Sequence, residues 1–290
     1  MEKKATFFFF GFGQSAKYFL KEFSKSKKKF NFFTTNTSKT HNIYFNKRKY
    51  RSFKFKNDNY DKSLLQSLAQ SEYILVSIPP QGRNDIVLKK FSKNLKKLKF
   101  KKLIYLSATS VYGNHNGKWV SENSQLKGKT KLGARRIAVE NKWKSFRDKT
   151  HHDINILRVS GIYSKESNVI KKIRKKKIYV KEEKFFSRIR VEDLALIIKK
   201  IFFSKKKSMI LNASDDKPAT NKEVAFFVAK LLKIKYLKPV SILNFKNKMI
   251  KEFYKDSKRV SNTNMKRKLK LKLKYPTYKK GLIDIFNNLN

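Results

Sequence analysis

The chain has 290 residues, of which 40% are hydrophobic and 14% aromatic, so it can form a core and is not a disordered polyelectrolyte. Its 72 lysines and arginines outnumber 21 aspartates and glutamates, and the resulting formal charge of +51 is spread over almost every segment. Because basic patches are expected to be local, this spread indicates a chain-wide lysine bias, with only non-specific binding of nucleic acid through charge. The absence of cysteine excludes disulfides and cysteine metal sites, and no metal site is predicted.

The first apolar run covers residues 5–10 and stops at Gly11. It is too short to span a membrane, and no small-residue cleavage site follows it. We therefore expect a cytoplasmic protein without a membrane partner.

Predicted strands and helices alternate along the chain. The strands are expected at 5–10, 31–35, 52–56, 73–78, 103–106, 154–159 and 209–212, and the helices at 14–23, 85–97, 131–147, 192–203, 220–232 and 279–288. Strand 73–78 is apolar at nearly every position, as in strands buried on both faces of a sheet. The alternation predicts an α/β chain with a Rossmann-type, doubly wound parallel sheet.

Lysine and leucine alternate within residues 265–274. A period of two is typical of a strand with one buried face, so this stretch predicts a basic surface strand. An RNA-binding strip is the alternative.

Residues 11–16 fit the pattern G-x-G-x-x-[GA], between the first predicted strand and the first predicted helix. In this context the glycines allow the backbone to approach a pyrophosphate, which the helix start then binds. The predicted phosphate-binding residues are Gly11, Gly13, Gln14, Ser15 and Ala16.

An acidic residue that would bind the adenosine ribose is missing at the end of the second predicted strand. The sequence there reads Thr34, Thr35 and Asn36, followed by hydroxyl residues and Lys39. This composition suits a 2′-phosphate better than a bare ribose diol, so NADP is favoured over NAD. The remaining residues predicted to line the cofactor crevice follow strand 73–78 and are Ser77, Ile78 and Pro79.

Four groups of segments, in order, resemble the extended and atypical short-chain dehydrogenase/reductase superfamily, especially its NAD-dependent epimerase/dehydratase-like members. They are GFGQSA at 11–16; ILVSIPP at 74–80; LIYLSATSVYG at 103–113 with WVSE at 119–122; and the later segments 157–163, 186–195, 211–224 and 257–269. The similarity extends over nearly the whole chain.

The resemblance implies a dinucleotide-binding Rossmann domain with a small C-terminal substrate lobe. The domain is expected over 1–165 and 191–215, and the lobe over 166–190 and 216–290. The implied function is that of an NAD(P)-binding oxidoreductase or epimerase acting on a nucleotide sugar or a related polar metabolite. A homodimer is an open alternative to a monomer.

The catalytic residues of this superfamily are missing. Its active members use Ser or Thr with a Tyr-x-x-x-Lys pair, in which the tyrosine transfers a proton. The Ser/Thr place, four residues before Tyr112, is Ala108, and the pair's places are assigned to Gly133 and Ile137.

Two hypotheses account for this loss. In the first, other residues act at the site: Tyr112 donates a proton and Arg188 clamps an anionic substrate, with Glu122, Arg135 and Arg190 as further candidates. In the second, the protein binds a dinucleotide without turnover and acts as a sensor or regulatory protein.

Overall fold

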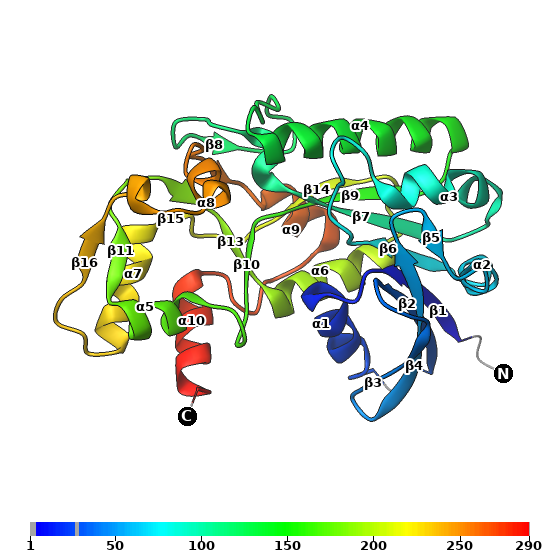
Figure 1. Ribbon diagram of the computed structural model, residues 1–290, viewed down its shortest axis with the longest axis horizontal. Helices are drawn as coiled ribbons and strands as arrows, with labels where there is room; N and C mark the ends of the chain where they lie inside the picture. Colours follow the sequence, from blue (N-terminus) through cyan, green and yellow to red (C-terminus); the bar gives the residue numbers. More distant parts are fainter. Residues whose placement is uncertain (1–3, 27–28, 290) are drawn as a thin grey trace. The chain divides into compact units, whose positions relative to one another are not determined.

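The computed structural model describes residues 4–26 and 29–289. They form two compact units (Figure 1). Unit 1 contains the described residues up to Ser107, Arg135–Leu157 and Leu194–Ile210, and unit 2 contains Ala108–Ala134, Arg158–Asp193 and the described residues from Leu211 onwards. Residues 108–134, expected in the Rossmann domain, lie in unit 2.

A mostly parallel sheet is the framework of unit 1. Within the described residues it has nine strands in the order β14-β9-β7-β6-β1-β2-β4-β3, with β5 paired to β4. The strands are β1 Ala5–Phe10, β2 Phe30–Asn36, β3 His41–Phe45, β4 Arg48–Lys56, β5 Asn59–Tyr60, β6 Tyr73–Val76, β7 Lys102–Ala108, β9 Ile154–Val159 and β14 Ile210–Ala213. The pairs β1–β2, β1–β6, β6–β7 and β2–β4 are parallel, which confirms the predicted Rossmann-type sheet.

The helices associated with this sheet are α1 Gln14–Phe23, α2 Leu64–Ala69, α3 Ile86–Lys97, α4 Lys131–Thr150 and α6 Val191–Phe202. The side chains of four consecutive phenylalanines in β1 alternate between the two faces of the sheet, and helices pack against them on both faces. Phe7 and Phe9 contact Phe19 of α1, with ring centroids 5.3 and 4.9 Å apart, and both contact Phe202 of α6.

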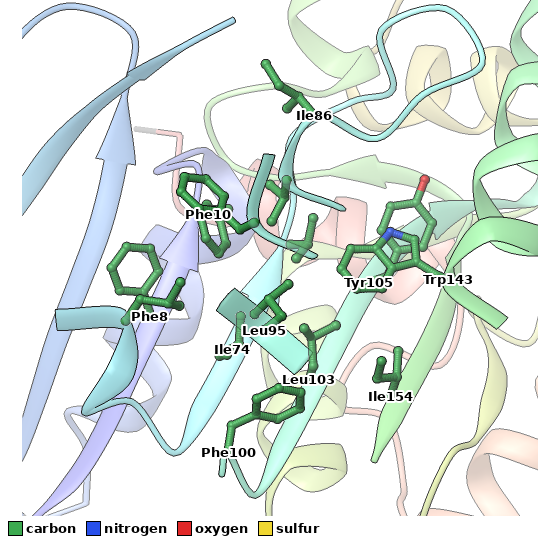
Figure 2. Packing of buried hydrophobic residues seen from close by; sticks show 14 of the residues in the cluster. Phe8, Phe10, Ile74, Ile86, Leu95, Phe100, Leu103, Tyr105, Trp143 and Ile154 are labelled. Carbon is green, nitrogen blue, oxygen red and sulfur yellow. The ribbon is translucent and has the colours of Figure 1, made fainter. Parts of the chain in front are cut away.

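Phe8 and Phe10 point into the core on the opposite face, which α2, α3 and α4 cover (Figure 2). Phe10 packs against Phe91 of α3 with ring centroids 5.4 Å apart. Trp143 of α4 stacks on Tyr105 of β7 at 5.9 Å. Helices on both faces explain why β1 is apolar at consecutive positions instead of alternating.

Unit 2 consists of shorter elements. They are η1 Thr109–Tyr112, β8 Trp119–Val120, β10 Gly161–Tyr163, α5 Val169–Lys176, β11 Ile178–Val180, β12 Phe185–Phe186, β13 Arg188–Arg190, β15 Ala219–Thr220, α7 Asn221–Leu231, β16 Lys238–Val240, η2 Ile242–Asn244, α8 Lys248–Phe253, β17 Arg259–Val260, α9 Thr263–Leu269 and α10 Tyr278–Asn287. A core of buried residues joins α5, α7 and α10, including Ile170, Val228 and Ile285. The side chains of Thr220 and Glu223 form a capping box at the start of α7.

The strand predicted over 265–274 is wrong. Helix α9 occupies the first part of this stretch, and the remainder pairs with no strand among the described residues. Leu269, Leu271 and Leu273 are nevertheless buried, whereas the lysines between them are exposed. The alternation of leucine and lysine therefore reflects a segment that buries its leucines although it forms no strand.

The described part of the chain also contains a strand that the sequence did not predict. Strands β3 and β4 pair antiparallel and form a hairpin, and β4 also pairs parallel with β2. No helix in this part of the chain has both the length and the apolar character needed to cross a membrane.

Candidate functional site

The turn between β1 and α1 begins at Gly11, which has a φ of +97°. A Cβ atom at this position would lie 2.9 Å from Ser77 Oγ and 3.4 Å from Ile78 Cγ1. Both the backbone conformation and the close approach of β6 therefore require glycine here. The predicted glycine turn is present, and Ser77 and Ile78 lie directly beside it.

Helix α1 starts at this turn with Gly13 as its N-cap residue. No atom lies within 4 Å of where a Gly13 Cβ would stand, so the chain is open on that side of Gly13. Amides in the first turn of a helix lack intrahelical acceptors and carry the positive end of its dipole. Ala16 is fully buried against the sheet, and α1 carries no acidic residue in its first turn that would repel a phosphate.

Thr34 and Thr35, predicted to contact the cofactor, use their hydroxyls to hold the turn instead. Thr35 Oγ1 accepts a hydrogen bond from the Gly11 amide at 2.9 Å, and Thr34 Oγ1 donates to the Phe9 carbonyl at 2.9 Å. Both side chains are almost completely buried, Thr34 at 0% and Thr35 at 2% exposure. Their role in the structure is to fix the backbone of the turn.

Asn36 organises the loop after β2. Its side-chain amide donates to the Lys39 carbonyl at 2.9 Å and to Ser52 Oγ at 2.8 Å, while its Oδ1 accepts from the Ser38 amide. Ser38 and Lys39 are exposed at the tip of this loop. The Ser38 hydroxyl donates to Asn36 Oδ1 at 2.8 Å, so its lone pairs and the ammonium group of Lys39 are the groups that the loop turns to solvent.

Ser77 closes the other side of the turn. Its hydroxyl donates to the Phe10 carbonyl at 2.9 Å, and its amide donates to the same oxygen at 3.1 Å. Ile78 is half-buried and Pro79 is exposed. Unit 1 thus brings the predicted cofactor residues of β1, β2 and β6 together at the carboxyl ends of three neighbouring parallel strands, where open α/β sheets bind ligands.

Tyr112, the predicted proton donor, is enclosed in unit 2. Its hydroxyl donates to Asn212 Oδ1 at 2.7 Å and accepts from Arg158 Nη1 at 3.0 Å. The side chain is fully buried, and burial raises the pKa of its hydroxyl. Glu122 supports the same network by accepting the Asn212 amide at 2.8 Å. In this structure the Tyr112 hydroxyl is therefore buried and bonded to two side chains, and its role as a proton donor stays a prediction.

Arg188, the predicted clamp for an anion, is held by internal acceptors. It donates to the carbonyls of Phe186 and Ala219 at 2.9 and 3.0 Å, and to Asn221 Oδ1 at 3.1 Å. Burial lowers the pKa of its guanidinium. Arg188 thus makes three hydrogen bonds within unit 2, and its role as an anion clamp stays a prediction.

The other two arginines considered from the sequence differ in position. Arg190 forms ion pairs with Glu192 at 2.6 Å and with Asp284 at 3.0 Å, so it too has internal partners. Arg135 is half-buried in α4, in the part of that helix that belongs to unit 1.

A small pocket in unit 2, called here the Lys258 pocket, collects chemistry-bearing side chains. Its hydroxyl residues are Thr109, Ser110, Thr130 and Ser187, its charged residues are Glu252, Asp256 and Lys258, and its apolar wall includes Leu132, Phe185, Phe186 and Phe253. Strand β7 ends at Ala108 and the chain turns at once into η1. This change of backbone direction brings both Thr109 and Ser110 to the pocket, although neighbours on a strand would face opposite ways.

The start of α4 supplies Leu132 to this pocket. Gly133 instead packs against backbone, since a Cβ there would lie 2.7 Å from both the Ser110 carbonyl oxygen and Gly128 Cα. The position that faces the pocket is therefore one residue before the position assigned from the sequence. In either assignment no tyrosine is present.

Lys258 and Asp256 form an ion pair in the pocket, with Nζ and Oδ2 separated by 3.2 Å. Their side chains are only 12% and 13% exposed. Burial lowers the pKa of Lys258, and the carboxylate of Asp256 opposes this change. The lysine is thus a polar group held in place beside apolar and hydroxyl-bearing walls.

Asp215 is a buried carboxyl in the segment after β14. Oδ1 accepts a hydrogen bond from the Lys217 amide at 3.2 Å, whereas Oδ2 has no partner among the described atoms. Burial raises the pKa of Asp215 to about 8, although the nearby Arg188 guanidinium opposes this shift. The side chain is therefore neutral over much of the physiological range.

The sequence did not indicate Asp256. Lys258 is the lysine of a Tyr-x-x-x-Lys string that begins at Tyr254, but strings of this kind occur by chance in a chain with 13 tyrosines and so many lysines, and this one was therefore discounted.

No family model matches the chain, and no curated protein matches it by sequence. Solved structures do match. A conserved protein of unknown function from Silicibacter pomeroyi DSS has a TM-score of 0.85 and 23% identity, covering 98% of this chain and 99% of that chain.

Two enzymes are also similar over almost their whole length. A UDP-N-acetylglucosamine 4-epimerase from Methanobrevibacter ruminantium M1, solved with UDP-N-acetylmuramic acid, has a TM-score of 0.76 and 17% identity, covering 99% of this chain and 98% of that one. A UDP-glucuronic acid 4-epimerase from Bacillus cereus, solved with UDP-glucuronic acid and NAD, has a TM-score of 0.77 and 14% identity, covering 98% and 100%. The chain therefore has the same Rossmann-type fold as these solved proteins over nearly its whole length.

Proposed function

We propose that the protein binds a nicotinamide dinucleotide through unit 1 and acts as an oxidoreductase or epimerase on a nucleotide sugar or a related polar metabolite. The observation that carries this proposal is the turn at Gly11, where only a residue without a side chain fits beside Ser77 and Ile78. The similar enzymes solved with NAD or a UDP-sugar support the proposed ligand classes.

The residues present fit a dinucleotide. Gly13, Gln14 and Ser15 would hold its pyrophosphate through the backbone amides at the start of α1. Thr35 and Ser77 would act indirectly, because their hydroxyls fix the two sides of the turn. Ile78 and Pro79 would provide an apolar edge to the crevice.

NADP is the favoured form of the cofactor. The loop after β2 presents the hydroxyl of Ser38 and the ammonium group of Lys39 to solvent, and Asn36 shapes this loop. A 2′-phosphate gains charge-assisted hydrogen bonds from such groups, whereas a ribose diol is usually held by a carboxylate.

When bound, a nicotinamide dinucleotide supplies hydride transfer to or from a carbon that carries oxygen. The residues of this chain would bind and orient the metabolite. Thr109 and Ser110 offer hydroxyls in the Lys258 pocket, and Lys258 offers a proton at Nζ beside Asp256.

The proposal is tested by fluorescence titration with NADPH and NADH, followed by hydride exchange with a panel of nucleotide sugars and free sugars. We expect micromolar NADPH binding, weaker NADH binding and exchange with at least one member of the panel. Failure of both dinucleotides to bind at millimolar concentration would remove the proposed function, even with the fold intact.

A second candidate function is dinucleotide binding without turnover. Two observations favour it. The start of α4 supplies Leu132 to the pocket and no tyrosine that could transfer a proton, and Tyr112 is buried. Tight NADPH binding without exchange on any compound of the panel would select this sensor-like function over the enzyme.

A further inference from the structure

The charges that line the Lys258 pocket disfavour an anion. Among the described residues that line it, Lys258 is the single cation, and it is already paired with Asp256. Glu252 adds a second carboxylate, whose pKa is lowered by its hydrogen bond with Lys255. A diphosphate needs cationic groups that are free to pair with it, and this lining does not provide them.

Three cations near the pocket have internal contacts, whereas Lys131, next to Leu132, is exposed and close enough to Glu252 to lower the pKa of that carboxyl. Lys255 pairs with Glu252, and the guanidinium of Arg259 lies 3.5 Å from the ring centroid of Phe185 and donates to the Gly117 carbonyl. Arg188 donates to the Phe186 carbonyl and to two further internal acceptors. The hydrogen bonds of both arginines are therefore made within the protein.

The size and walls of the pocket also disfavour a nucleoside diphosphate. It encloses about 60 Å³, whereas pockets that bury a drug-sized ligand measure roughly 300–1,000 Å³. Phe186 and Phe253 are stacked with ring centroids 4.6 Å apart and form a flat apolar wall. The hydroxyls of Thr109 and Ser110 and the Lys258–Asp256 pair form the polar lining.

We propose that the Lys258 pocket binds a small uncharged polyhydroxylated compound, no larger than a monosaccharide, and excludes a nucleoside diphosphate. The C–H face of such a compound packs on Phe253, and its hydroxyl groups bond with Asp256 and Lys258. This inference rests on the proposed function, since it narrows the metabolite class of the same site from a nucleotide sugar to the related polar compounds.

Saturation-transfer NMR on the full-length protein, with and without NADPH, tests this choice of ligand. The probes are D-glucose, D-xylose and glycerol as neutral compounds, and UDP and UDP-glucose as anions. We expect saturation of at least one neutral probe that persists at about 0.5 M salt, because no net charge is involved. The anions are expected to give only a signal that disappears at that salt concentration, since the chain carries a formal charge of +51.

Two matched variants locate the signal. Phe253→Ala removes an aromatic side chain that is 52% exposed, and Phe226→Ala removes one that is 50% exposed on α7, outside the pocket lining. We expect the first to reduce the neutral-probe signal at least fivefold and the second to leave it unchanged. Equal effects, or no neutral-probe signal in the natural protein, would overturn the proposal.

A third variant tests the charge argument directly. In the double variant Glu252→Gln with Asp256→Asn, the unpaired Lys258 becomes available to a small anion, so the affinity for inorganic phosphate should rise about tenfold, whereas UDP-glucose remains too large for the pocket. The proposal would be contradicted if UDP bound to the natural protein at about 0.5 M salt and Phe253→Ala abolished that binding, because the pocket would then be a diphosphate site. Loss of NADPH binding is a separate result, which sinks the proposed function and leaves the assignment of the pocket standing.

Discussion

The turn at Gly11 in unit 1 and the Lys258 pocket in unit 2 would present different kinds of groups to a ligand. The turn offers backbone amides, and the side chains of Thr35 and Ser77 only hold that backbone in place. The pocket offers side chains, contributed by segments that lie more than a hundred residues apart in the sequence. Backbone recognition therefore depends on conformation and tolerates composition bias, whereas side-chain recognition depends on the identity of each residue.

The largest expected effect comes from breaking the backbone site. Gly11→Ala places a methyl group 2.9 Å from Ser77 Oγ at a φ of +97°, so NADPH affinity should fall at least about 100-fold. Fluorescence titration measures this loss. Gly82→Ala is the control, because that glycine also has a positive φ of +60° but no atom within 4 Å of its Cβ position. Equal affinities for the two variants would refute the role of the turn.

The buried carboxyl of Asp215 makes the stability of unit 2 depend on pH, whereas the turn at Gly11 contains no titratable side chain. Its pKa is about 8 in the folded chain and near 3.8 when exposed, so the folded state holds a proton that the unfolded state has released. The free energy of unfolding should therefore fall as the pH rises from about 4 to 8.

Asp215→Asn cannot ionise and should lose this fall, which makes the variant more stable than the natural chain by about 2 kcal/mol at pH 9 but not at pH 4. Denaturant unfolding at both pH values measures the difference. A stability difference that does not change with pH would contradict the raised pKa.

A smaller effect is expected from the support of the turn. Thr35→Val keeps the shape of the side chain but removes the acceptor of the Gly11 amide, which costs about 1 kcal/mol and lowers NADPH affinity roughly fivefold. Thermal unfolding and titration measure the two effects. Thr37→Val, at an exposed position of the same loop, should change neither quantity.

The smallest effect concerns the form of the cofactor. Lys39→Ala removes an exposed cation and should lower NADPH affinity about threefold while NADH affinity stays the same, since only NADPH carries the 2′-phosphate. Lys47→Ala is a matched exposed lysine in unit 1. An equal loss for both dinucleotides would indicate a general effect of charge instead of 2′-phosphate recognition.

The same contrast explains what could be predicted from the sequence. The parallel sheet follows from local patterns, because apolar runs such as β1 and β6 are set by burial on both faces. The turn at Gly11 was predictable since all its parts lie within six residues. Strand β3 was not, because its alternation is weak and its stability comes from pairing with β4.

The pocket could not be predicted from the sequence for a related reason. Thr109, Phe186 and Lys258 come together only when η1, β12 and the segment before β17 are in place. No periodicity connects such residues, and the sequence reasoning therefore selected Tyr112 and Arg188, whose side chains are held inside unit 2. Candidate residues chosen by type alone do not reveal whether their polar groups are already bonded.

The leucines at 269, 271 and 273 are buried while the lysines between them face solvent. Drift toward lysine codons can fill every outward position of such a segment without disturbing the packing beneath it. The packing of such a segment depends on its inward-facing residues, so changes at the outward positions leave the architecture intact.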